Sequence, residues 1–397
     1  MAATNFLLGR CGVVDPSSLD AYAANGGLAG LRRAREIGPA AIVDELTSSE
    51  LVGRGGAAFP TGRKWAGVAA ARGPKYVICN ADESEPGTFK DRKLLEEDPF
   101  AIVEAMLIAG LAVGAVGGYF YIRGEYALAA RRIQHAIDAL EAHGELGDLR
   151  LEVRRGGGAY VCGEETALMN SIEGKRGEPR SKPPFPTERG LFNQPTLINN
   201  VETLANVPLI VERGGAWFRS IGVPGLVGPK LFCVSGHVQR PGVYEVAGGT
   251  SLRELLEHHT GGVKGSTFQA VLLGGAAGTY VTPREFDTAL DYQSLRTIGA
   301  SIGSGAVIAF NESVDMWDMV RRFAEFFAEE SCGQCVPCRV GTVRQVELLH
   351  RLDGSASFEV LTDLGQAMQS ASICGLGQTA ATQVLSAIAQ FGGRSGS

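Results

Sequence analysis

The sequence has no excess of positive charge, no basic leader and few histidines. Its formal net charge of −6 offers no basic footprint for a nucleic acid, so we expect none as a partner. Met1 to Arg10 lacks the basic start and the long apolar run of a signal peptide, which points to a cytoplasmic protein. The six histidines, including the His258-His259 pair, show no metal-ligand spacing, and we expect surface or structural roles for them.

One long stretch without charge remains to be explained. The 18 residues from Ala105 to Ile122 contain no charged side chain and reach the lower limit for a membrane-spanning helix. The stretch contains four glycines, and its character changes at Gly117-Gly118. Tyr119 to Ile122 then has the residues typical of a strand. We therefore expect a buried helix followed by a central strand, with no membrane span in this chain.

The size and the glycine content indicate a protein of several domains that binds ligands. A chain of 397 residues is long enough for two or three domains. The 54 glycines are nearly twice the usual share. Much of the backbone must therefore turn sharply or approach a ligand closely, as phosphate and flavin sites require.

Four of the eight cysteines form the strongest motif. Cys332, Cys335 and Cys338 are spaced C-x2-C-x2-C, and Cys374 follows 36 residues later. Three closely spaced thiolates can bind three corners of an iron–sulfur cube while a distant fourth completes it. Zinc is the alternative, but structural zinc sites usually pair their ligands as two C-x2-C units. We therefore predict one [4Fe–4S] cluster on these four residues.

The other cysteines carry no motif. Without an export signal, disulfides are not expected. The remaining thiols are scattered along the chain, and we expect them to be small buried apolar residues: Cys11, Cys79, Cys162 and Cys233.

The pattern along the chain predicts an α/β protein. Short strands, expected at Tyr76–Asn80, Tyr119–Ile122 and Leu149–Val153, alternate with helical stretches, which is typical of a mostly parallel sheet. Ligands bind at the carboxyl ends of such strands, where the acidic loop after Asn80 lies. We divide the chain into an N-terminal helical segment, the α/β domain, a small module and a helical domain with the cysteines: 1–47, 48–227, 228–312 and 313–397.

The small module has short elements and no predicted chemistry of its own. Lys230–Gly236 alternates like a strand, and Pro241–Tyr244 is typical of a turn into another strand. Ser251 is expected to cap a short helix that runs through Glu257, because Glu254 follows it at the capping-box spacing.

A glycine-rich loop runs from Gly53 to Trp65. Gly53, Gly55 and Ala58 formally fit a dinucleotide fingerprint, but the loop follows a helical segment rather than a strand, so an ordinary Rossmann phosphate loop is not expected. Glycines let backbone N–H groups face an anion or a flat ring, and Arg54 and Lys64 offer charge to a phosphate. A tight structural turn without a ligand is the alternative.

Carboxylates follow two apolar or glycine-rich segments. Asp82, Glu83 and Glu85 lie in the loop after Asn80, and Glu164 and Glu165 follow the glycine run at 156–158. Such loops are often only solvated surface, but their place after buried segments favours a lined pocket. The carboxylates could accept hydrogen bonds from ribose, nicotinamide or flavin groups. Calcium is not favoured, since no EF-hand spacing is present.

From about residue 10 to 390 the sequence resembles the NADH-binding flavoprotein subunit of respiratory complex I. It also resembles the diaphorase subunits of NAD-linked formate dehydrogenases and NAD-reducing hydrogenases. The matching motifs are long: Gly53–Trp65, Asn80–Arg92, Gly156–Gly174, Lys182–Pro186, Asn199–Thr203 and Glu330–Gly341. The resemblance implies a Rossmann-like FMN/NADH domain, a β-grasp (ubiquitin-like) module and a helical bundle that holds the cluster.

The resemblance also implies the ligand contacts. FMN would be held by Gly53, Arg54, Gly55, Gly56, Lys64, Asn80, Asp82, Glu83, Tyr160, Gly163, Glu164, Asn199 and Asn200. NADH would stack on the flavin and contact Phe59, Glu85, Glu165, Lys182 and Phe185. The four cysteines match the cluster ligands of the family. No catalytic acid or base is required, because the flavin carries the hydride transfer, and Glu83 and Glu164 are expected to support it.

Two positions depart from the family pattern. Ala58 stands where the family usually has glycine, and Gly67 replaces an aromatic residue that is a natural stacking partner for adenine. Gly67 leaves a second hypothesis open, an electron-relay or scaffold subunit without nucleotide turnover. A zinc-stabilised binding module is the third. The enzyme hypothesis is favoured over both, because the residues implied for NADH binding are intact: Glu85, Glu165, Lys182 and Phe185.

The function implied is hydride transfer between NADH and FMN, followed by single-electron transfer with the cluster, as in the NADH dehydrogenase module of complex I. A diaphorase subunit of a soluble formate dehydrogenase or hydrogenase is the alternative. The chain has neither a fused thioredoxin-like [2Fe–2S] segment nor a ferredoxin tail. The expected partners are therefore a thioredoxin-like [2Fe–2S] subunit and a larger iron–sulfur, molybdenum or nickel–iron subunit. Any membrane attachment would come through partners at the inner face of the cytoplasmic membrane.

Overall fold

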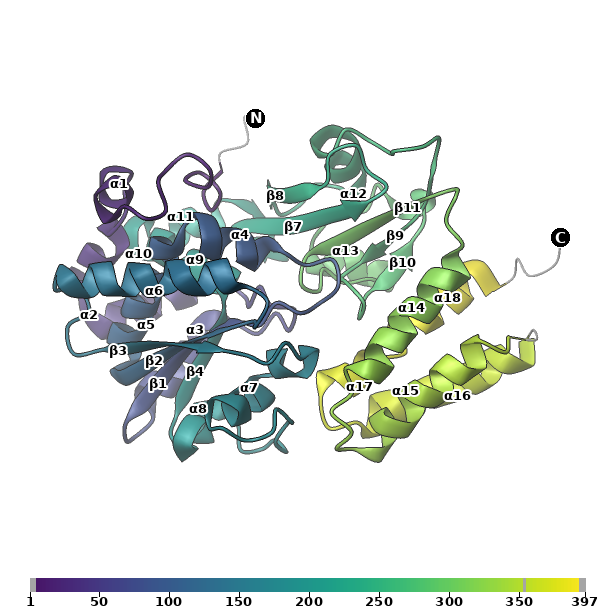
Figure 1. The fold of residues 1–397 in the computed structure, drawn as a ribbon. Coiled ribbons are helices and arrows are strands. Elements are labelled where there is room, and N and C mark those ends of the chain that lie inside the picture. Colours follow the sequence, from purple (N-terminus) through teal and green to yellow (C-terminus); the bar gives the residue numbers. More distant parts are fainter. Residues whose placement is uncertain (1–4, 353–354, 393–397) are drawn as a thin grey trace.

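The computed structural model describes residues 5–352 and 355–392, and its first large unit is built on a parallel sheet (Figure 1). The four strands lie in the order β3-β2-β1-β4, and every neighbouring pair is parallel. Their bounds are Lys75–Ala81 (β1), Ala115–Ile122 (β2), Arg150–Arg155 (β3) and Thr196–Asn200 (β4). The predicted α/β class and the three predicted strands are confirmed. β4 was anticipated only as a ligand motif.

The uncharged stretch divides between a helix and a strand, as predicted. α5 (Pro99–Val113) is buried along almost its whole length, and β2 begins at Ala115, earlier than the sequence suggested. Gly114 ends the helix with φ +67°, a conformation that favours glycine. In the described part of the chain, no helix combines the length and apolar character needed to cross a membrane.

Helices cover this sheet and connect its strands (Figure 1). The bounds are Leu19–Ala24 (α1), Ala29–Ser48 (α2), Thr61–Ala70 (α3), Lys90–Glu97 (α4), Ala127–Ala142 (α6), Glu165–Ile172 (α7), Pro186–Arg189 (α8), Val201–Ala205 (α9), Val207–Arg213 (α10) and Gly215–Arg219 (α11). A one-turn 3₁₀ helix, η1, covers Tyr160–Gly163.

The N-terminal prediction was wrong in its first part. Residues 5–18 form no helix. Instead, the backbone N–H groups of Phe6, Leu7 and Leu8 donate to the carboxylate of Glu245 at 2.7–2.9 Å. These bonds fasten the segment to the second sheet, and Pro16 is unfavourable inside a helix. The predicted helical stripe does exist further on, where Leu28, Leu31 and Ala34 are buried.

The module that follows is a mixed five-stranded sheet in the order β10-β9-β11-β7-β8. β7 pairs in antiparallel fashion with β8 and in parallel with β11, as expected for a β-grasp-like sheet. The bounds are Pro229–Gly236 (β7), Gly242–Ala247 (β8), Phe268–Leu273 (β9), Thr279–Val281 (β10) and Ala306–Asn311 (β11). Ser251 caps α12 (Leu252–Glu254) through the N–H of Glu254, and a short π-helical turn continues to His259. α13 covers Tyr292–Thr297.

Buried charges join this module to the parallel-sheet unit. Lys230 of β7 and Glu202 of α9 form an ion pair at 2.8 Å, and both side chains are fully buried. Lys90 approaches the same carboxylate at 3.0 Å, and the N–H of Leu231 donates to it at 2.9 Å. These buried ion pairs hold the module against the parallel-sheet unit. Removing one partner would leave an unpaired buried charge, which costs much free energy.

The last described part of the chain consists of helices that gather beside the second sheet (Figure 1). Their bounds are Met316–Glu329 (α14), Val336–Leu349 (α15), Ser355–Ala371 (α16), Gly375–Thr379 (α17) and Thr382–Phe391 (α18). Asp315 is the N-cap of α14, and its carboxylate accepts the N–H groups of Trp317 and Asp318. The N–H of Tyr280 in β10 donates to Ser386 of α18 at 2.8 Å, which ties the bundle to the module.

Candidate functional site

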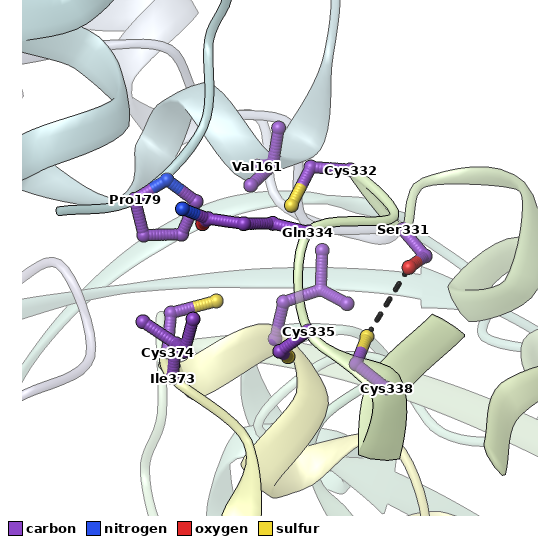
Figure 2. A pocket seen from close by; sticks show the side chains of 10 residues that line it. Val161, Pro179, Ser331, Cys332, Gln334, Cys335, Cys338, Ile373 and Cys374 are labelled. Carbon is purple, nitrogen blue, oxygen red and sulfur yellow. Dashed lines mark hydrogen bonds between the residues drawn. The ribbon is translucent and has the colours of Figure 1, made fainter. Parts of the chain in front are cut away.

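The four motif cysteines line one cavity (Figure 2). Cys332 lies in the loop after α14, Cys335 is the N-cap of α15, Cys338 lies in the first turn of α15, and Cys374 is the N-cap of α17. Val161, Pro179, Ser331, Gln334, Ile373 and Leu376 complete the lining. The fold therefore brings together ligands that are separated by 36 residues in the sequence.

The loop that carries three of these cysteines is fixed by hydrogen bonds. The hydroxyl of Ser331 lies 3.3 Å from the sulfur of Cys338 (Figure 2). Arg176 donates to the carbonyl of Cys332 at 2.7 Å, and Arg339 donates to the carbonyl of Gly333 at 3.1 Å. The backbone geometry of the loop is thus held by side chains from outside the motif as well as within it.

The donor set and its setting fit an iron–sulfur cube. Among the described residues, no three His, Cys, Asp or Glu side chains lie close enough to share one metal ion. Four cysteine thiols around one cavity are the donor set that a [4Fe–4S] cluster takes. Burial raises the pKa of Cys338 to about 11 and also raises the pKa of Cys374. Binding of the cluster would therefore displace thiol protons.

The glycine-rich loop lies between α2 and α3. Gly53 donates its N–H to the carbonyl of Phe59 at 2.9 Å, so the loop closes on itself. Gly56 has φ +123°, and Ala58 adopts the left-handed region with φ +51°, which explains why a glycine suits position 58. The expectation that no ordinary Rossmann phosphate loop is present holds, because a helix rather than a strand precedes the glycines.

Arg54 provides buried cationic nitrogens beside this loop. Its side chain is 1% exposed, and Nη2 donates to the carbonyl of Val227 at 2.6 Å. Among the described residues, Nε and Nη1 have no hydrogen-bond partner although both are buried. Unsatisfied buried donors are rare in proteins, so these two nitrogens fit an anionic ligand such as the FMN phosphate.

Polar residues meet at the carboxyl ends of β1 and β4. Asn80 donates to the carbonyl of Gly163 at 2.9 Å, and Trp65 of α3 donates to Asn199 at 3.0 Å. Asn200 caps α9 and donates to Asp91 at 2.6 Å. A Cβ added at Gly55 would lie 3.0 Å from the Cβ of Asn200, so the glycine permits this close approach.

Asp82 is the carboxylate at this edge that keeps an unused oxygen. It is 1% exposed, and burial raises its pKa to about 7. Oδ2 accepts from the hydroxyl of Ser84 at 2.7 Å, whereas Oδ1 is buried with no partner among the described residues. Half protonated near neutrality, Asp82 can donate or accept a hydrogen bond to a ligand.

Two of the predicted flavin-supporting carboxylates act as helix caps. Glu83 accepts the N–H groups of Asp91 and Arg92 at 2.7 and 2.8 Å, at the start of α4. Its burial, followed by the nearby Asp91, raises its pKa to about 8. Glu164 caps α7 by accepting the N–H groups of Thr166 and Ala167 at 2.8 and 2.9 Å. Contact of either carboxylate with FMN stays a prediction.

The residues predicted for NADH fall into two groups. Lys182 bonds Glu164 at 2.8 Å and Glu165 at 3.3 Å, and Phe59 and Phe185 are 44% and 52% exposed. Although burial alone would lower it, the pKa of Lys182 is raised by these carboxylates. Exposed aromatic rings beside a charged cluster suit a dinucleotide.

Glu85 lies apart from that group. It is hydrogen-bonded to the hydroxyl of Tyr160 and accepts the N–H of Ala277 at 3.0 Å. Burial raises its pKa. Glu85 therefore links the strand-end loop to both η1 and the second sheet.

Lys64 lies near residues that are predicted to contact FMN and residues that are predicted to contact NADH. Its Nζ donates to the carbonyl of Ile198 at 3.1 Å and lies 5.9 Å from the centre of the Phe59 ring. Burial lowers its pKa, while Glu165 opposes this. The position allows contact with either ligand.

η1 connects the flavin residues to the cluster cavity. The N–H of Tyr160 donates to Glu330 at 2.8 Å, and its ring packs against Phe326 and Phe327 of α14. The next residue, Val161, lines the cysteine cavity. Two residues later, Gly163 receives the bond from Asn80. A single turn thus borders both candidate sites.

The same three parts are found by comparison with known families. A model of the Nuo51 FMN-binding domain matches residues 46–209, and a model of the NADH-ubiquinone oxidoreductase-F iron-sulfur binding region matches residues 318–395. An SLBB domain matches residues 230–307. The chain is 45% identical to the F 2 subunit of the NADH-quinone oxidoreductase of Rhizobium meliloti (strain 1021), across 97% of this chain and 95% of that protein.

The chain belongs to the family of NADH-quinone oxidoreductase F subunits. It is also 43% identical to the NADP-reducing hydrogenase subunit HndC of Solidesulfovibrio fructosivorans, over 96% of this chain and 81% of that protein. A crystal structure of an NAD+-reducing [NiFe]-hydrogenase in the H2-reduced state superposes with a TM-score of 0.87 and 38% identity. That match covers 97% of this chain, which spans 65% of the hydrogenase chain.

Membership of this family confirms several predictions at once. The fold class, the FMN and [4Fe–4S] cofactors and the NADH-oxidoreductase class are as expected from the sequence. The zinc-stabilised module is therefore set aside. Of the other cysteines, Cys79, Cys162 and Cys233 are buried as expected, and Cys11 is only partly buried.

Sequence reasoning missed the residues that connect the two sites. Glu330 was seen only as the start of a motif, and Phe326, Phe327 and Arg176 were not singled out. The sequence could have indicated Glu330 by its position two residues before Cys332, because residues that flank cluster ligands often orient them.

Proposed function

We propose that this chain is the subunit that oxidises or reduces the nicotinamide in a multi-subunit complex, and that its predicted contact residues hold the ligands. FMN, when bound, would exchange a hydride with NADH and pass electrons singly to the cluster. The glycine loop, Arg54 and Lys64 would hold the phosphate and ring, and the β1 and β4 ends would contact the remaining polar groups. The four-part division of the chain is proposed with it.

The arrangement of η1 is the observation that carries this proposal. Tyr160 is bonded to Glu85, which is predicted to contact NADH, and Gly163 is bonded to Asn80, which is predicted to contact FMN, while Val161 lines the cysteine cavity. Residues of one four-residue turn therefore border both sites. The protein's contribution is to place both redox groups against this turn and to keep water from the path.

The residues assigned to NADH have clear tasks. Phe59 and Phe185 would flank the nucleotide, and Glu85, Glu165 and Lys182 would contact its polar groups. The scaffold hypothesis is not favoured, since these residues are intact and Lys182 is paired with Glu165 at 3.3 Å.

The partner of the complex is proposed from two kinds of relatives. A quinone-linked complex is supported by the 45% identity to the Rhizobium meliloti NADH-quinone oxidoreductase protein. A hydrogenase diaphorase is supported by HndC and by the NAD+-reducing hydrogenase, while a formate dehydrogenase diaphorase stays an untested alternative. In either case we propose a thioredoxin-like [2Fe–2S] subunit and a larger metal-containing subunit as neighbours, at the cytoplasmic side.

The test uses the full chain, reconstituted anaerobically with FMN, iron and sulfide. We expect bound flavin, acid-labile sulfide and NADH-dependent reduction of ferricyanide. Cys374→Ser should lose the iron–sulfur absorption but keep the flavin, whereas the matched control Cys11→Ser should keep both. Protein that binds neither FMN nor sulfide after reconstitution would overturn the proposal, and bound flavin without NADH turnover would support the scaffold hypothesis instead.

A further inference from the structure

Lys90 and Asp91 form a buried ion pair at the start of α4. Their side chains are 1% and 2% exposed, and Nζ of Lys90 lies 2.7 Å from Oδ1 of Asp91. Neither residue is among the predicted contacts of FMN or NADH. Burying two charges costs free energy even when they are paired, so such a pair is weak evidence for a stabilising role. The pair is better explained by the groups that its atoms hold in place.

The second oxygen of the Asp91 carboxylate holds the side-chain amide of Asn200. Asn200 is the last residue of β4, and its Nδ2 donates to Oδ2 of Asp91 at 2.6 Å. The amide oxygen meets groups of the opposite kind. Oδ1 accepts the backbone N–H of Glu202 at 3.0 Å and lies 3.4 Å from Nζ of Lys90. Each end of the amide is therefore matched by its neighbours.

These neighbours allow one orientation of the amide. With the amide turned over, its oxygen would face the Asp91 carboxylate, and its NH2 group would face the Glu202 N–H and the Lys90 ammonium. A carboxylate has no hydrogen to donate, and neither an ammonium nor a backbone N–H has a lone pair to accept with. Asp91 and Lys90 thus fix which end of the Asn200 amide is the donor end.

The orientation of the amide determines what Asn200 offers to a ligand. Nδ2 carries two hydrogens, and within the described residues it donates only to Asp91. The amide lies against the glycine-rich loop, because a Cβ built on Gly55 would lie 3.4 Å from Cγ and 3.7 Å from Nδ2 of Asn200. Asn200 is also only partly buried. Its second hydrogen is therefore available beside the loop that is predicted to hold FMN.

We propose that Asp91 is a positioning residue for FMN, which keeps an N–H of Asn200 available to a hydrogen-bond acceptor of the flavin nucleotide. The inference rests on the proposed function, because Asn200 is a predicted FMN contact. Asp91 is buried and acts through the Asn200 amide. FMN offers acceptor atoms on its phosphate, its ribityl chain and its ring. A carbonyl oxygen in place of the N–H would repel any of them.

An exchange of the two side chains separates positioning from folding. In Asp91→Asn, the new amide turns its oxygen to the Lys90 ammonium, and its NH2 group then faces the NH2 group of Asn200. The double variant Asp91→Asn/Asn200→Asp removes this conflict, since the amide at position 91 donates to the carboxylate at position 200. The net charge is unchanged. The atom presented to the glycine-rich loop, however, becomes an oxygen that carries no hydrogen.

The full chain is reconstituted with its cluster, and its affinity for FMN is measured from the quenching of flavin fluorescence during titration. Urea unfolding of the flavin-free protein measures stability. The variants are Asp91→Asn, Asn200→Ala, the combination of these two, the exchange variant and Asp148→Asn. Asp148 is the matched control, because it is an exposed aspartate in the turn before β3.

We expect Asp91→Asn and Asn200→Ala each to weaken FMN binding by roughly tenfold or more, which corresponds to the loss of one hydrogen bond. Adding Asp91→Asn to Asn200→Ala should change the dissociation constant by less than about twofold, because Asp91 acts through the amide that is already missing. The exchange variant should regain most of the stability that Asp91→Asn loses, yet bind FMN no better than Asp91→Asn does. Asp148→Asn should match wild type.

Three results would overturn the positioning role. They are wild-type FMN affinity in Asp91→Asn, an equal further loss when Asp91→Asn is added to Asn200→Ala, and recovery of both stability and FMN affinity in the exchange variant. If Asp91→Asn alone does not fold, the exchange variant still decides, since it binds FMN weakly if Asp91 positions the donor and normally if the pair is only structural. A wild-type chain that binds no FMN would instead overturn the proposed function.

Discussion

The backbone N–H of Tyr160 donates a 2.8 Å hydrogen bond to the carboxylate of Glu330. Tyr160 belongs to the turn that borders the flavin residues, and Glu330 lies two positions before the ligand Cys332. The two candidate redox sites are therefore joined by one short bond between distant parts of the chain, supported by the packing of the Tyr160 ring on Phe326 and Phe327.

Removing this bond should uncouple the sites. Glu330→Ala leaves the Tyr160 N–H without its acceptor, at a cost of about 1–3 kcal/mol. We expect slower reduction of the cluster by NADH, followed by stopped-flow absorption, with ferricyanide activity largely kept. Glu330→Gln still offers an oxygen and should behave nearly as wild type. Equal rates in the alanine and wild-type proteins would show that the bond has no role in coupling.

Ser331 should tune the cluster. Its hydroxyl lies 3.3 Å from the sulfur of Cys338, and hydrogen bonds to ligand sulfurs stabilise the more negative, reduced state of a cluster. Ser331→Ala is expected to lower the midpoint potential, measured by redox titration with electron paramagnetic resonance. Ser370→Ala, at an exposed position of α16 in the same bundle, is the control. An unchanged or raised potential in Ser331→Ala would contradict this role.

These tests bear on what the sequence could and could not foresee. The cluster ligands were predictable, because C-x2-C-x2-C with a distant cysteine is a covalent constraint that few sites satisfy. The parallel sheet was also predictable from apolar strands alternating with helices. β4 was missed because Asn199 and Asn200 are poor strand formers, and pairing with β1 overrides that local preference.

The roles of individual carboxylates were harder to predict. A glutamate after a strand can face a ligand or cap the next helix, and the sequence does not distinguish the two. Glu83 and Glu164 cap α4 and α7, whereas Asp82 keeps a buried oxygen without a partner among the described residues. The helical prediction for the N-terminus failed for a related reason, since the Glu245 carboxylate that binds residues 6–8 is more than 200 positions away.

Asp82 should make stability depend on pH. Its pKa rises from 3.8 to about 7 on folding because of burial. The folded state binds the Asp82 proton more tightly than the unfolded state does. The contribution of this carboxyl group to the free energy of unfolding is therefore complete below pH 4 and is lost as the pH rises through 7. Asp82→Asn should therefore be more stable than wild type at pH 8, by up to about 4 kcal/mol.

Urea unfolding of the flavin-free protein between pH 5 and 8 measures this effect. The advantage of Asp82→Asn should shrink steadily toward the acidic end of the range. Asp20→Asn, a change at an exposed residue of α1, controls for the loss of one negative charge. A difference that does not vary with pH would mean that the Asp82 carboxyl does not titrate in this window.

The buried ion pair between Glu202 and Lys230 should hold the module in place. Glu202 also receives Lys90 and the N–H of Leu231. Glu202→Gln leaves the buried ammonium group of Lys230 without its counter-charge, whereas Lys90 keeps Asp91 at 2.7 Å. The substitution should cost about 3–5 kcal/mol of unfolding free energy. Glu212→Gln, at a half-exposed site on α10, should cost less than about 0.5 kcal/mol. Thermal and urea unfolding of both variants would check the contrast.

Gly67 offers the most direct test of nucleotide binding. It lies on the exposed side of α3, and a Cβ built there meets nothing within 4 Å. The family resemblance drawn from the sequence implies an aromatic residue at this position, and the space around Gly67 leaves room for one. Gly67→Phe restores a ring that could stack on adenine, worth about 0.5–1.5 kcal/mol. We therefore expect the KM for NADH to fall by roughly 2- to 12-fold with little change in kcat.

Gly67→Ala separates stacking from the effect of removing a helical glycine. Alanine should raise helix stability by roughly 0.5–1 kcal/mol without changing the KM. Steady-state NADH–ferricyanide kinetics on the three proteins give the comparison. If alanine and phenylalanine lower the KM equally, rigidity of α3 limits binding. If neither does, adenine does not pass over this part of α3.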